Sequence, residues 1–187
     1  MTYRILIADD EPLIRTDLRE SLEELGYRVV AEARDGREAL ELIEQTRPDI
    51  AILDIKMPHV DGIAIAESVA SRLPVILLTA YSDKNLINGA REAGVMAYLT
   101  KPFRQKDLSP AIELAVSHFL EQSSLSERVS ELRDQLESRK LIEKAKGLLM
   151  DVEGLTEKEA YRHIQQMSMK KNKPMKEVAG AIILMMG

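Results

Sequence analysis

The feature that most constrains the fold of this chain is a set of five short apolar runs, separated by stretches with helical spacing. The runs are Arg4 to Ala8, Arg28 to Ala31, Ile50 to Leu53, Val75 to Thr79 and Met96 to Thr100. Buried parallel strands read as unbroken apolar runs, and strands that alternate with helices form βαβ units around a parallel sheet. We therefore expect residues 1–120 to form a doubly wound α/β domain with five parallel strands.

Residues with ionisable or hydroxyl side chains stand at the ends of four of these runs. Asp9 and Asp10 follow the first run, Asp54 follows the third, Thr79 ends the fourth and Lys101 follows the fifth. In doubly wound sheets the ligand site lies beyond the carboxyl ends of the strands. A single aspartate at such a position is usually a helix cap or a turn residue. Because four of the predicted strands end in carboxylate, hydroxyl or ammonium groups that suit one reaction, we instead predict that these residues form one functional site.

The grouping of three carboxylates with one ammonium suggests phosphoryl transfer. Three converging carboxylates repel one another unless a cation is present, and Mg²⁺ prefers carboxylate, carbonyl, water and phosphate oxygens. Asp54, after the central run, is then free to act as a nucleophile that forms an aspartyl phosphate. Lys101 and the ion would stabilise the charge of the phosphoryl oxygens, and Thr79 could donate its hydroxyl to the same group.

A phosphatase of the haloacid-dehalogenase type is an alternative that uses the same nucleophile. Those enzymes carry a second aspartate, the general acid, two residues after the first. In this chain that position is Lys56, which cannot serve as that acid. We therefore expect a protein that phosphorylates and dephosphorylates only itself, rather than a turnover enzyme.

Composition excludes several other classes of protein. The chain of 187 residues has 45% hydrophobic and 30% charged residues, as in ordinary globular proteins. It has no cysteine, which excludes disulfides and thiolate metal sites, and no apolar run near the roughly 20 residues that a membrane-spanning helix requires. We expect a cytoplasmic protein without a membrane segment.

A long helix is predicted to join the first domain to the C-terminal region. Residues 111–146 contain neither proline nor glycine, and Leu125, Val129, Leu132 and Leu136 recur at spacings of four, three and four. This spacing is a short heptad pattern, which we assign to a linker over residues 121–137. Residues 125–136 could pair two copies of the chain as a homodimer, or pack against the same chain.

Residues 138–187 are predicted to form a small three-helix domain. Gly154 ends the first helix, Thr156 and Glu159 form a capping box that opens the second, and Pro174 opens the third. The region carries ten Lys/Arg and six Asp/Glu, so residues 1–137 hold a net charge of −9 within the total of −5. Such a basic region is either a nucleic-acid surface or simply a solvated one.

Two groups of residues are candidates for a phosphate-binding surface in this domain. On the first helix Gly147 falls away from the apolar face, where it costs roughly 1 kcal/mol relative to alanine and so suggests the close approach of a partner. The candidates are Lys140, Lys144 and Gly147 on the first helix, and Lys170, Lys171 and Lys173 before Pro174.

Residues 1–120 resemble the receiver domain of two-component response regulators, a flavodoxin-like fold. The resemblance lies in the motifs IADDEP, LDIKMP, LLTAY and LTKPF. It implies that Asp54 accepts a phosphoryl group from a sensor histidine kinase. It also implies that Thr79 is the switch hydroxyl and that Lys101 is the active-site lysine typical of the family. Tyr98 falls on the switch aromatic position.

The same resemblance implies a set of magnesium ligands. Asp10, Asp54 and the backbone carbonyl of Lys56 would bind Mg²⁺ directly, and Asp9 through water. It also implies a cis peptide bond between Lys101 and Pro102, which would direct the lysine into the site.

The C-terminal region resembles the ANTAR domain, a three-helix RNA-binding domain. The resemblance lies in IEKAKGLLM from Ile142, EAYRHI from Glu159, SMKKNKPM from Ser168 and EVAGAI from Glu177. It implies binding to tandem RNA stem-loops in nascent transcripts and transcription antitermination, under the control of phosphorylation. The alternative is an output domain that binds a protein partner. DNA binding ranks lower because the last helix is almost wholly apolar, unlike a recognition helix.

Overall fold

The computed structural model of the protein describes residues 2–80 and 97–186. The chain separates into two compact units, Met1–Ser123 and Ser124–Gly187, which meet within helix α5 (Gln105–Glu153). The long helix predicted across residues 111–146 is confirmed, and it extends further at both ends.

The first unit contains the predicted five-stranded parallel sheet, in the order β2-β1-β3-β4-β5. Its strands are β1 (Arg4–Ala8), β2 (Arg28–Ala33), β3 (Ile50–Asp54), β4 (Val75–Ala80) and β5 (Ala97–Lys101). Each strand predicted from an apolar run is present, and the run that was expected to start at Met96 is described from Ala97 onward. From β1 the chain adds β2 on one side and then β3, β4 and β5 on the other, so the strand order reverses between β1 and β3. The ligand site of a doubly wound fold is expected at this point.

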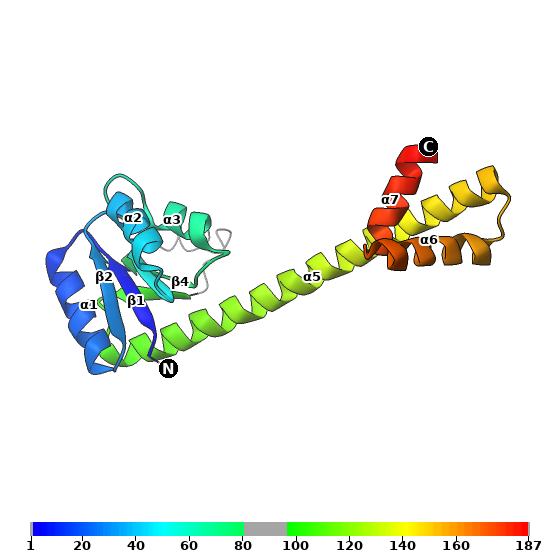
Figure 1. Ribbon diagram of the computed structural model, residues 1–187. Coiled ribbons are helices and arrows are strands. Elements are labelled where there is room, and N and C mark those ends of the chain that lie inside the picture. Colours follow the sequence, from blue (N-terminus) through cyan, green and yellow to red (C-terminus); the bar gives the residue numbers. More distant parts are fainter. Residues whose placement is uncertain (1, 81–96, 187) are drawn as a thin grey trace. The chain divides into compact units, whose positions relative to one another are not determined.

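Helices cover both faces of this sheet. They are α1 (Pro12–Glu24), α2 (Gly36–Thr46), α3 (Gly62–Val69) and the first turns of α5. Strand side chains alternate between two cores: Leu6, Leu53 and Leu77 pack with α2 and α3, whereas Ile7, Ile52 and Ile76 pack with α1 and α5. Figure 1 shows these helices on the two faces.

Start and stop signals in the sequence account for the helix boundaries. Pro12 occupies the first turn of α1, where its missing N–H is harmless, and Gly26 follows that helix with a φ of 84°. The carboxylate of Asp35 accepts hydrogen bonds from the backbone at the start of α2.

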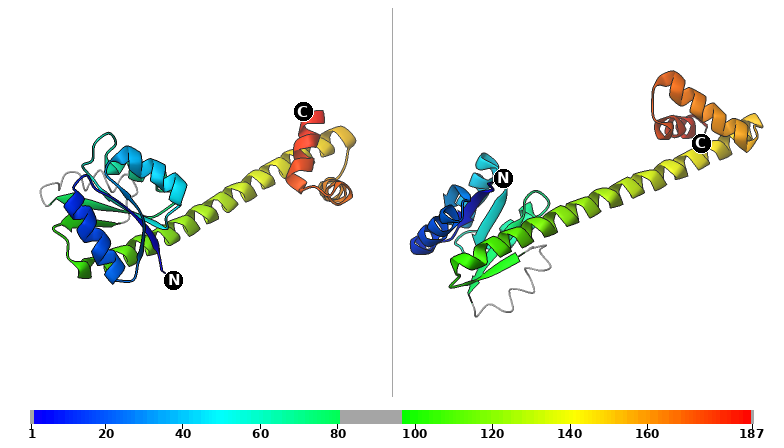
Figure 2. Two further views of the ribbon diagram at one scale, coloured as in Figure 1. Left: turned by 60° about the vertical axis from the view of Figure 1, so that its left-hand side comes forward. Right: turned by 90° about the horizontal axis from the view of Figure 1, so that it is seen from below.

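The second unit is the predicted three-helix domain. The C-terminal part of α5 packs with α6 (Glu157–Lys171) and α7 (Met175–Met186), as both views in Figure 2 show. Gly154 follows α5 with a φ of 68°, and Thr156 and Glu159 form the expected capping box. The core consists of Ala145, Leu149, Ala160, Ile164, Val178, Ala179 and Ile182.

Three of the six methionines in this unit are exposed rather than packed in the core. Met167, Met175 and Met186 pack at the edge of the core, but Met150, Met169 and Met185 are exposed. The heptad side chains Leu125, Val129, Leu132 and Leu136 are also exposed. Within the described residues, no helix has the length and apolar character needed to cross a membrane.

Candidate phosphoacceptor site

The predicted site residues meet at the carboxyl edge of the sheet. Asp54 is the last residue of β3 and Lys101 is the last residue of β5, while Asp9 directly follows β1. β1 and β3 are neighbours in register, with Ala8 opposite Leu53, so the residues that follow them lie side by side. Topology alone therefore brings together side chains that are far apart in the sequence.

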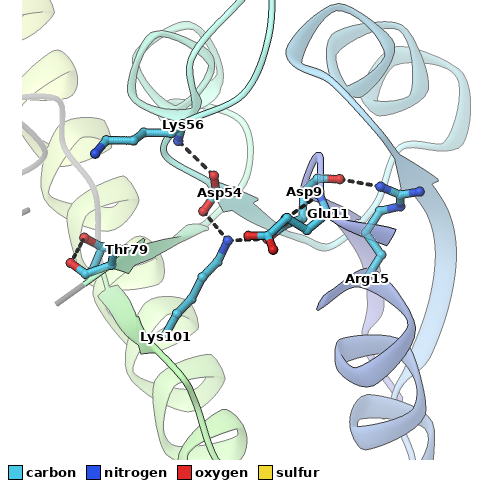
Figure 3. Close-up of polar contacts among 8 residues, drawn as sticks. Asp9, Glu11, Arg15, Asp54, Lys56, Thr79 and Lys101 are labelled. Atoms are coloured by element: carbon cyan, nitrogen blue, oxygen red, sulfur yellow. Dashed lines mark hydrogen bonds and ion pairs between the residues drawn. The ribbon is translucent and has the colours of Figure 1, made fainter. Parts of the chain in front are cut away.

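Lys101 bridges the two buried carboxylates. Its ammonium lies 2.6 Å from Oδ2 of Asp9 and 2.6 Å from Oδ1 of Asp54. The other oxygen of Asp54 accepts a hydrogen bond of 2.9 Å from the backbone N–H of Lys56. The peptide bond between Lys101 and Pro102 is cis, as expected. Figure 3 shows Lys101 pointing between the two aspartates.

The electrostatic balance of the site favours a proton or a cation beside Asp54. Burial raises the pKa of Asp54, the ammonium of Lys101 only partly offsets this, and the charge of Asp9 raises the pKa further. Burial by itself would lower the pKa of Lys101, but its hydrogen bonds and ion pairs with Asp54 and Asp9 outweigh burial and raise it. Lys101 is therefore held in its charged form, and one ammonium does not compensate both carboxylates fully.

The donor set fits a hard divalent cation. Asp9, Asp10 and Asp54 each offer a carboxylate oxygen, and these oxygens lie within 4.8 Å of one another. Oδ2 of Asp9 is buried, and the contact of 2.6 Å with the ammonium of Lys101 is its polar contact in the described part of the chain. Oxygen ligands of this kind suit Mg²⁺. The role of the Lys56 carbonyl as a further ligand stays a prediction.

Other residues of the site hold the main chain in place and were not predicted from the sequence. The backbone N–H of Glu11 donates to Oδ1 of Asp9 at 3.0 Å, and the guanidinium of Arg15 donates to the Asp9 carbonyl at 2.6 Å. Gly62 lies against Asp54, since a Cβ at position 62 would collide with the carbonyl oxygen of Asp54. Gly62 directly follows Asp61, which caps α3, and a glycine at this helix start was the sign in the sequence that the position is tightly packed.

Thr79 on β4 and Tyr98 on β5 form no hydrogen bond with the carboxylates of the site among the described residues. The Thr79 hydroxyl donates to the carbonyl of Ala80 at 3.2 Å, and Thr79 is only 1% exposed. Figure 3 shows its side chain apart from Asp54. The Tyr98 side chain, on β5, is 52% exposed. Their predicted switch roles therefore require movements that start from this arrangement.

The predicted RNA-binding residues lie on the surface of the second unit. Gly147 has open space where a side chain would stand. The lysines at 140, 144, 170, 171 and 173 are exposed, and Lys173 forms an ion pair of 3.1 Å with Glu177.

The sequence reasoning missed Lys146, which is only 6% exposed. Its ammonium lies 2.9 Å from a carboxylate oxygen of Glu143 and 2.7 Å from one of Glu157, and so joins α5 to α6. The position of Lys146 between the buried Ala145 and Leu149, three residues after Glu143, was the signal that could have identified it.

Comparison with known proteins identifies the family. The response regulator receiver domain matches residues 5–113, and the ANTAR domain matches residues 130–183. The chain belongs to the response regulators. It is 50% identical over 186 residues to the transcriptional regulatory protein PdtaR of Mycobacterium tuberculosis, covering 98% of this chain and 91% of PdtaR.

Solved receiver domains share the fold of the first unit. The receiver domain of a response regulator designated NarL from M. tuberculosis is 34% identical, with a TM-score of 0.57 over 59% of this chain and 93% of that structure. The receiver domain of a modulated diguanylate cyclase from Desulfovibrio desulfuricans is 32% identical, with a TM-score of 0.60 over 65% of this chain and 99% of that structure. The acidic site thus belongs to a receiver domain, and the three-helix unit to an ANTAR domain.

Proposed function

We propose that this response regulator takes a phosphoryl group on Asp54 from a sensor histidine kinase and thereby controls the binding of its ANTAR domain to RNA. The observation that carries the first half is the ion-pair geometry at the receiver site. Lys101 holds Asp54 at the tip of β3 while the opposite oxygen of Asp54 is fixed by the N–H of Lys56. A nucleophile fixed at both oxygens needs little reorganisation before it attacks.

The chemistry is an in-line displacement at phosphorus. A carboxylate oxygen of Asp54 attacks the phosphoryl group of a phosphohistidine, an O–P bond forms, the N–P bond breaks, and the electron pair stays on the histidine nitrogen. Lys101 stabilises the negative charge of the phosphoryl oxygens from one side. Asp9, Asp10 and Asp54 would hold Mg²⁺, which supplies further positive charge to the same oxygens.

The response follows from the position of Thr79. Its hydroxyl, now bonded to the Ala80 carbonyl, would turn to donate to a phosphoryl oxygen, and Tyr98 would move from its exposed position inward. The protein would phosphorylate and dephosphorylate only itself, in the cytoplasm. Water would later hydrolyse the aspartyl phosphate and restore the carboxylate.

The proposed output is transcription antitermination through tandem stem-loop RNA. The exposed lysines of the ANTAR domain offer positive charge to RNA phosphates, and the open space at Gly147 permits close approach of an RNA backbone. Residues 125–136 would pair two chains, because their heptad side chains are exposed and lie outside the hydrophobic core of the second unit. A paired ANTAR domain matches a target with two stem-loops.

A protein partner is the second candidate for the output domain. The observation in its favour is the exposure of large apolar side chains on the ANTAR domain, Met169, Leu184 and Met185. Exposed apolar groups of this kind mark protein contacts when they form a continuous patch.

Salt dependence of RNA binding separates the two candidates. Purified, phosphorylated protein is titrated with a two-stem-loop RNA at increasing salt concentration. Contacts with about three to five phosphates predict that log K falls with log salt at a slope of roughly −2 to −4. Replacement of Lys140 and Lys144 by glutamine should make that slope shallower. Absence of RNA binding at low salt would leave the protein partner as the output.

A further inference from the structure

The ANTAR domain carries a groove whose apolar interior has no role in the RNA binding proposed above. It has a volume of about 580 Å³ and is lined by residues of α6 and α7 together with Leu149 and Glu153 from the end of α5. Buried side chains of Leu149, Val178 and Ile182 form part of its lining. Protein sites for small ligands commonly have volumes of roughly 300–1,000 Å³ and apolar linings with a few polar groups.

One wall of the groove is formed by small residues. Gly180 and Ala181 of α7 line it, and a Cβ built on Gly180 would meet no atom within 4 Å. Packing within the chain therefore does not require a glycine there. An interior glycine weakens a helix by about 1 kcal/mol relative to alanine, so its presence suggests that a partner approaches the backbone closely.

The rim of the groove is continuous with the proposed RNA surface. Lys171 and Lys173, two of the predicted RNA-binding lysines, line it together with His163. Lys173 is paired with Glu177, whereas Lys171 forms no ion pair with any residue that the structure describes. Phosphates held at these lysines would place the attached nucleotide at the mouth of the groove.

Polar groups of the lining suit the edge of a nucleobase. The carboxylates of Glu153 and Glu177 line the groove and can accept hydrogen bonds from base amino or imino groups. The thioethers of Met167 and Met185 offer polarisable apolar surfaces to the base faces. Bases splayed out of RNA loops are bound in this manner, by burial of their faces and hydrogen bonds to their edges.

We propose that this groove receives one unstacked base from the loop of the RNA that the ANTAR domain binds. The inference rests on the proposed RNA-binding function and extends it, because it assigns loop recognition to the α6–α7 groove and general phosphate affinity to the lysines. The groove would then determine which loop sequence is chosen.

The test is a double-mutant cycle between the groove and the loop. The probe is a two-stem-loop RNA whose loops are enriched from a random pool on the phosphorylated full-length chain. Gly180→Leu fills the groove, and Ala181→Leu fills it from the adjacent exposed position. Gln165→Leu adds a similar side chain at an exposed α6 position that does not line the groove, and serves as the control. Circular dichroism checks that each variant is folded.

We expect both groove variants to bind this RNA roughly 5- to 150-fold more weakly, the factor that corresponds to loss of good hydrogen bonding to one base edge, with an unchanged salt slope, whereas Gln165→Leu binds like the original chain. An abasic nucleotide at one loop position should weaken the original chain by a similar factor but leave Gly180→Leu unaffected. If RNA binds and no loop position couples to the groove, this inference is overturned while the proposed function stands. If the original chain enriches no RNA at low salt, both are overturned.

Discussion

Lys101 is the residue on which the receiver site depends most directly. Among the residues that the structure describes, its ammonium is the cation that lies between the buried carboxylates of Asp9 and Asp54. When one partner of such a group is removed, the remaining buried charges lose their compensation. The lysine therefore stabilises the resting site, and in the proposed reaction it would also stabilise the phosphoryl group during transfer.

We predict that Lys101→Met abolishes rapid phosphorylation of Asp54 by a small phosphoryl donor with Mg²⁺. Without the ammonium, the phosphoryl oxygens lose one of their two sources of positive charge. The rate is measured by separation of phosphorylated and unphosphorylated chains on a phosphate-affinity gel. Lys106→Met, which removes an exposed lysine at the start of α5, is the matched control. Equal rates for the two variants would contradict the assigned role.

Gly62 gives a second prediction at this scale. A Cβ at position 62 collides with the Asp54 carbonyl, so Gly62→Ala must displace the end of β3. Overpacking of this kind costs about 1–3 kcal/mol, and we expect slower phosphorylation together with a lower unfolding temperature. Gly180→Ala adds the same atom in open space and should leave phosphorylation unchanged without lowering the unfolding temperature, because alanine favours a helix more than glycine does. Normal phosphorylation of Gly62→Ala would show that the position of Asp54 tolerates the displacement.

At the scale of the elements, the Lys146 network joins α5 to α6 and makes their association depend on pH. Hydrogen bonding to Lys146 lowers the pKa of Glu157, and hydrogen bonds with Glu157 and Glu143 raise the pKa of Lys146. A carboxyl group with a lowered pKa adds stability above its ordinary value of 4.5 and loses it as the pH falls through the folded-state pKa. An ammonium with a raised pKa adds stability below 10.5 and loses it as the pH rises through its folded-state pKa.

We therefore predict that the contact between α5 and α6 weakens below about pH 4.5 and above about pH 10.5. Urea unfolding followed by NMR signals of α6 measures this dependence. Lys146→Met keeps most of the buried aliphatic chain and should flatten both limbs of the pH profile, whereas Lys158→Met, on an exposed part of α6, should leave them intact. A Lys146→Met profile with the original shape would exclude the network as its cause.

The heptad segment carries the prediction of dimerisation. Leu125 and Leu132 are exposed, and their replacement by aspartate would place charges in a paired interface. We expect the original chain to sediment as a dimer when it is phosphorylated and the double variant as a monomer. A phosphorylated chain that stays monomeric at high concentration would contradict the homodimer.

The same elements show what the sequence could and could not predict. Continuous apolar runs predicted all five strands. The reason is plainest for β1, β3 and β4, which are buried along nearly all of their length and leave no room for polar alternation, whereas the edge strands β2 and β5 are only partly buried. The capping box at Thr156 marked the start of α6. The charged residues at the strand ends predicted the meeting of Asp9, Asp54 and Lys101, since parallel topology aligns those ends. Contacts such as that of Arg15 with the Asp9 carbonyl were out of reach, because they depend on side-chain direction and on packing between separate elements. The ion pair of Lys146 with Glu157 was missed for the same reason, although the place of Lys146 beside Ala145 and Leu149 was a signal for its burial.

At the scale of the whole molecule, a receiver domain and an ANTAR domain are two compact units whose division falls within α5. Phosphorylation can alter RNA affinity only if the two states of the receiver favour different states of the output domain. Coupling between sites in proteins is commonly worth 5- to 150-fold in affinity. The central claim is therefore quantitative: the aspartyl phosphate must change the affinity of the chain for RNA.

The most direct measurement is the dissociation constant of the tandem stem-loop RNA for the chain with and without phosphate on Asp54, at one fixed salt concentration. Asp54→Asn, treated with the same donor and Mg²⁺, controls for effects of the donor itself. The account predicts that phosphorylation tightens binding roughly 5- to 150-fold and that Asp54→Asn shows no change. Equal dissociation constants for phosphorylated and unphosphorylated chains, with full phosphate occupancy verified by mass spectrometry, would contradict control of RNA binding by the receiver.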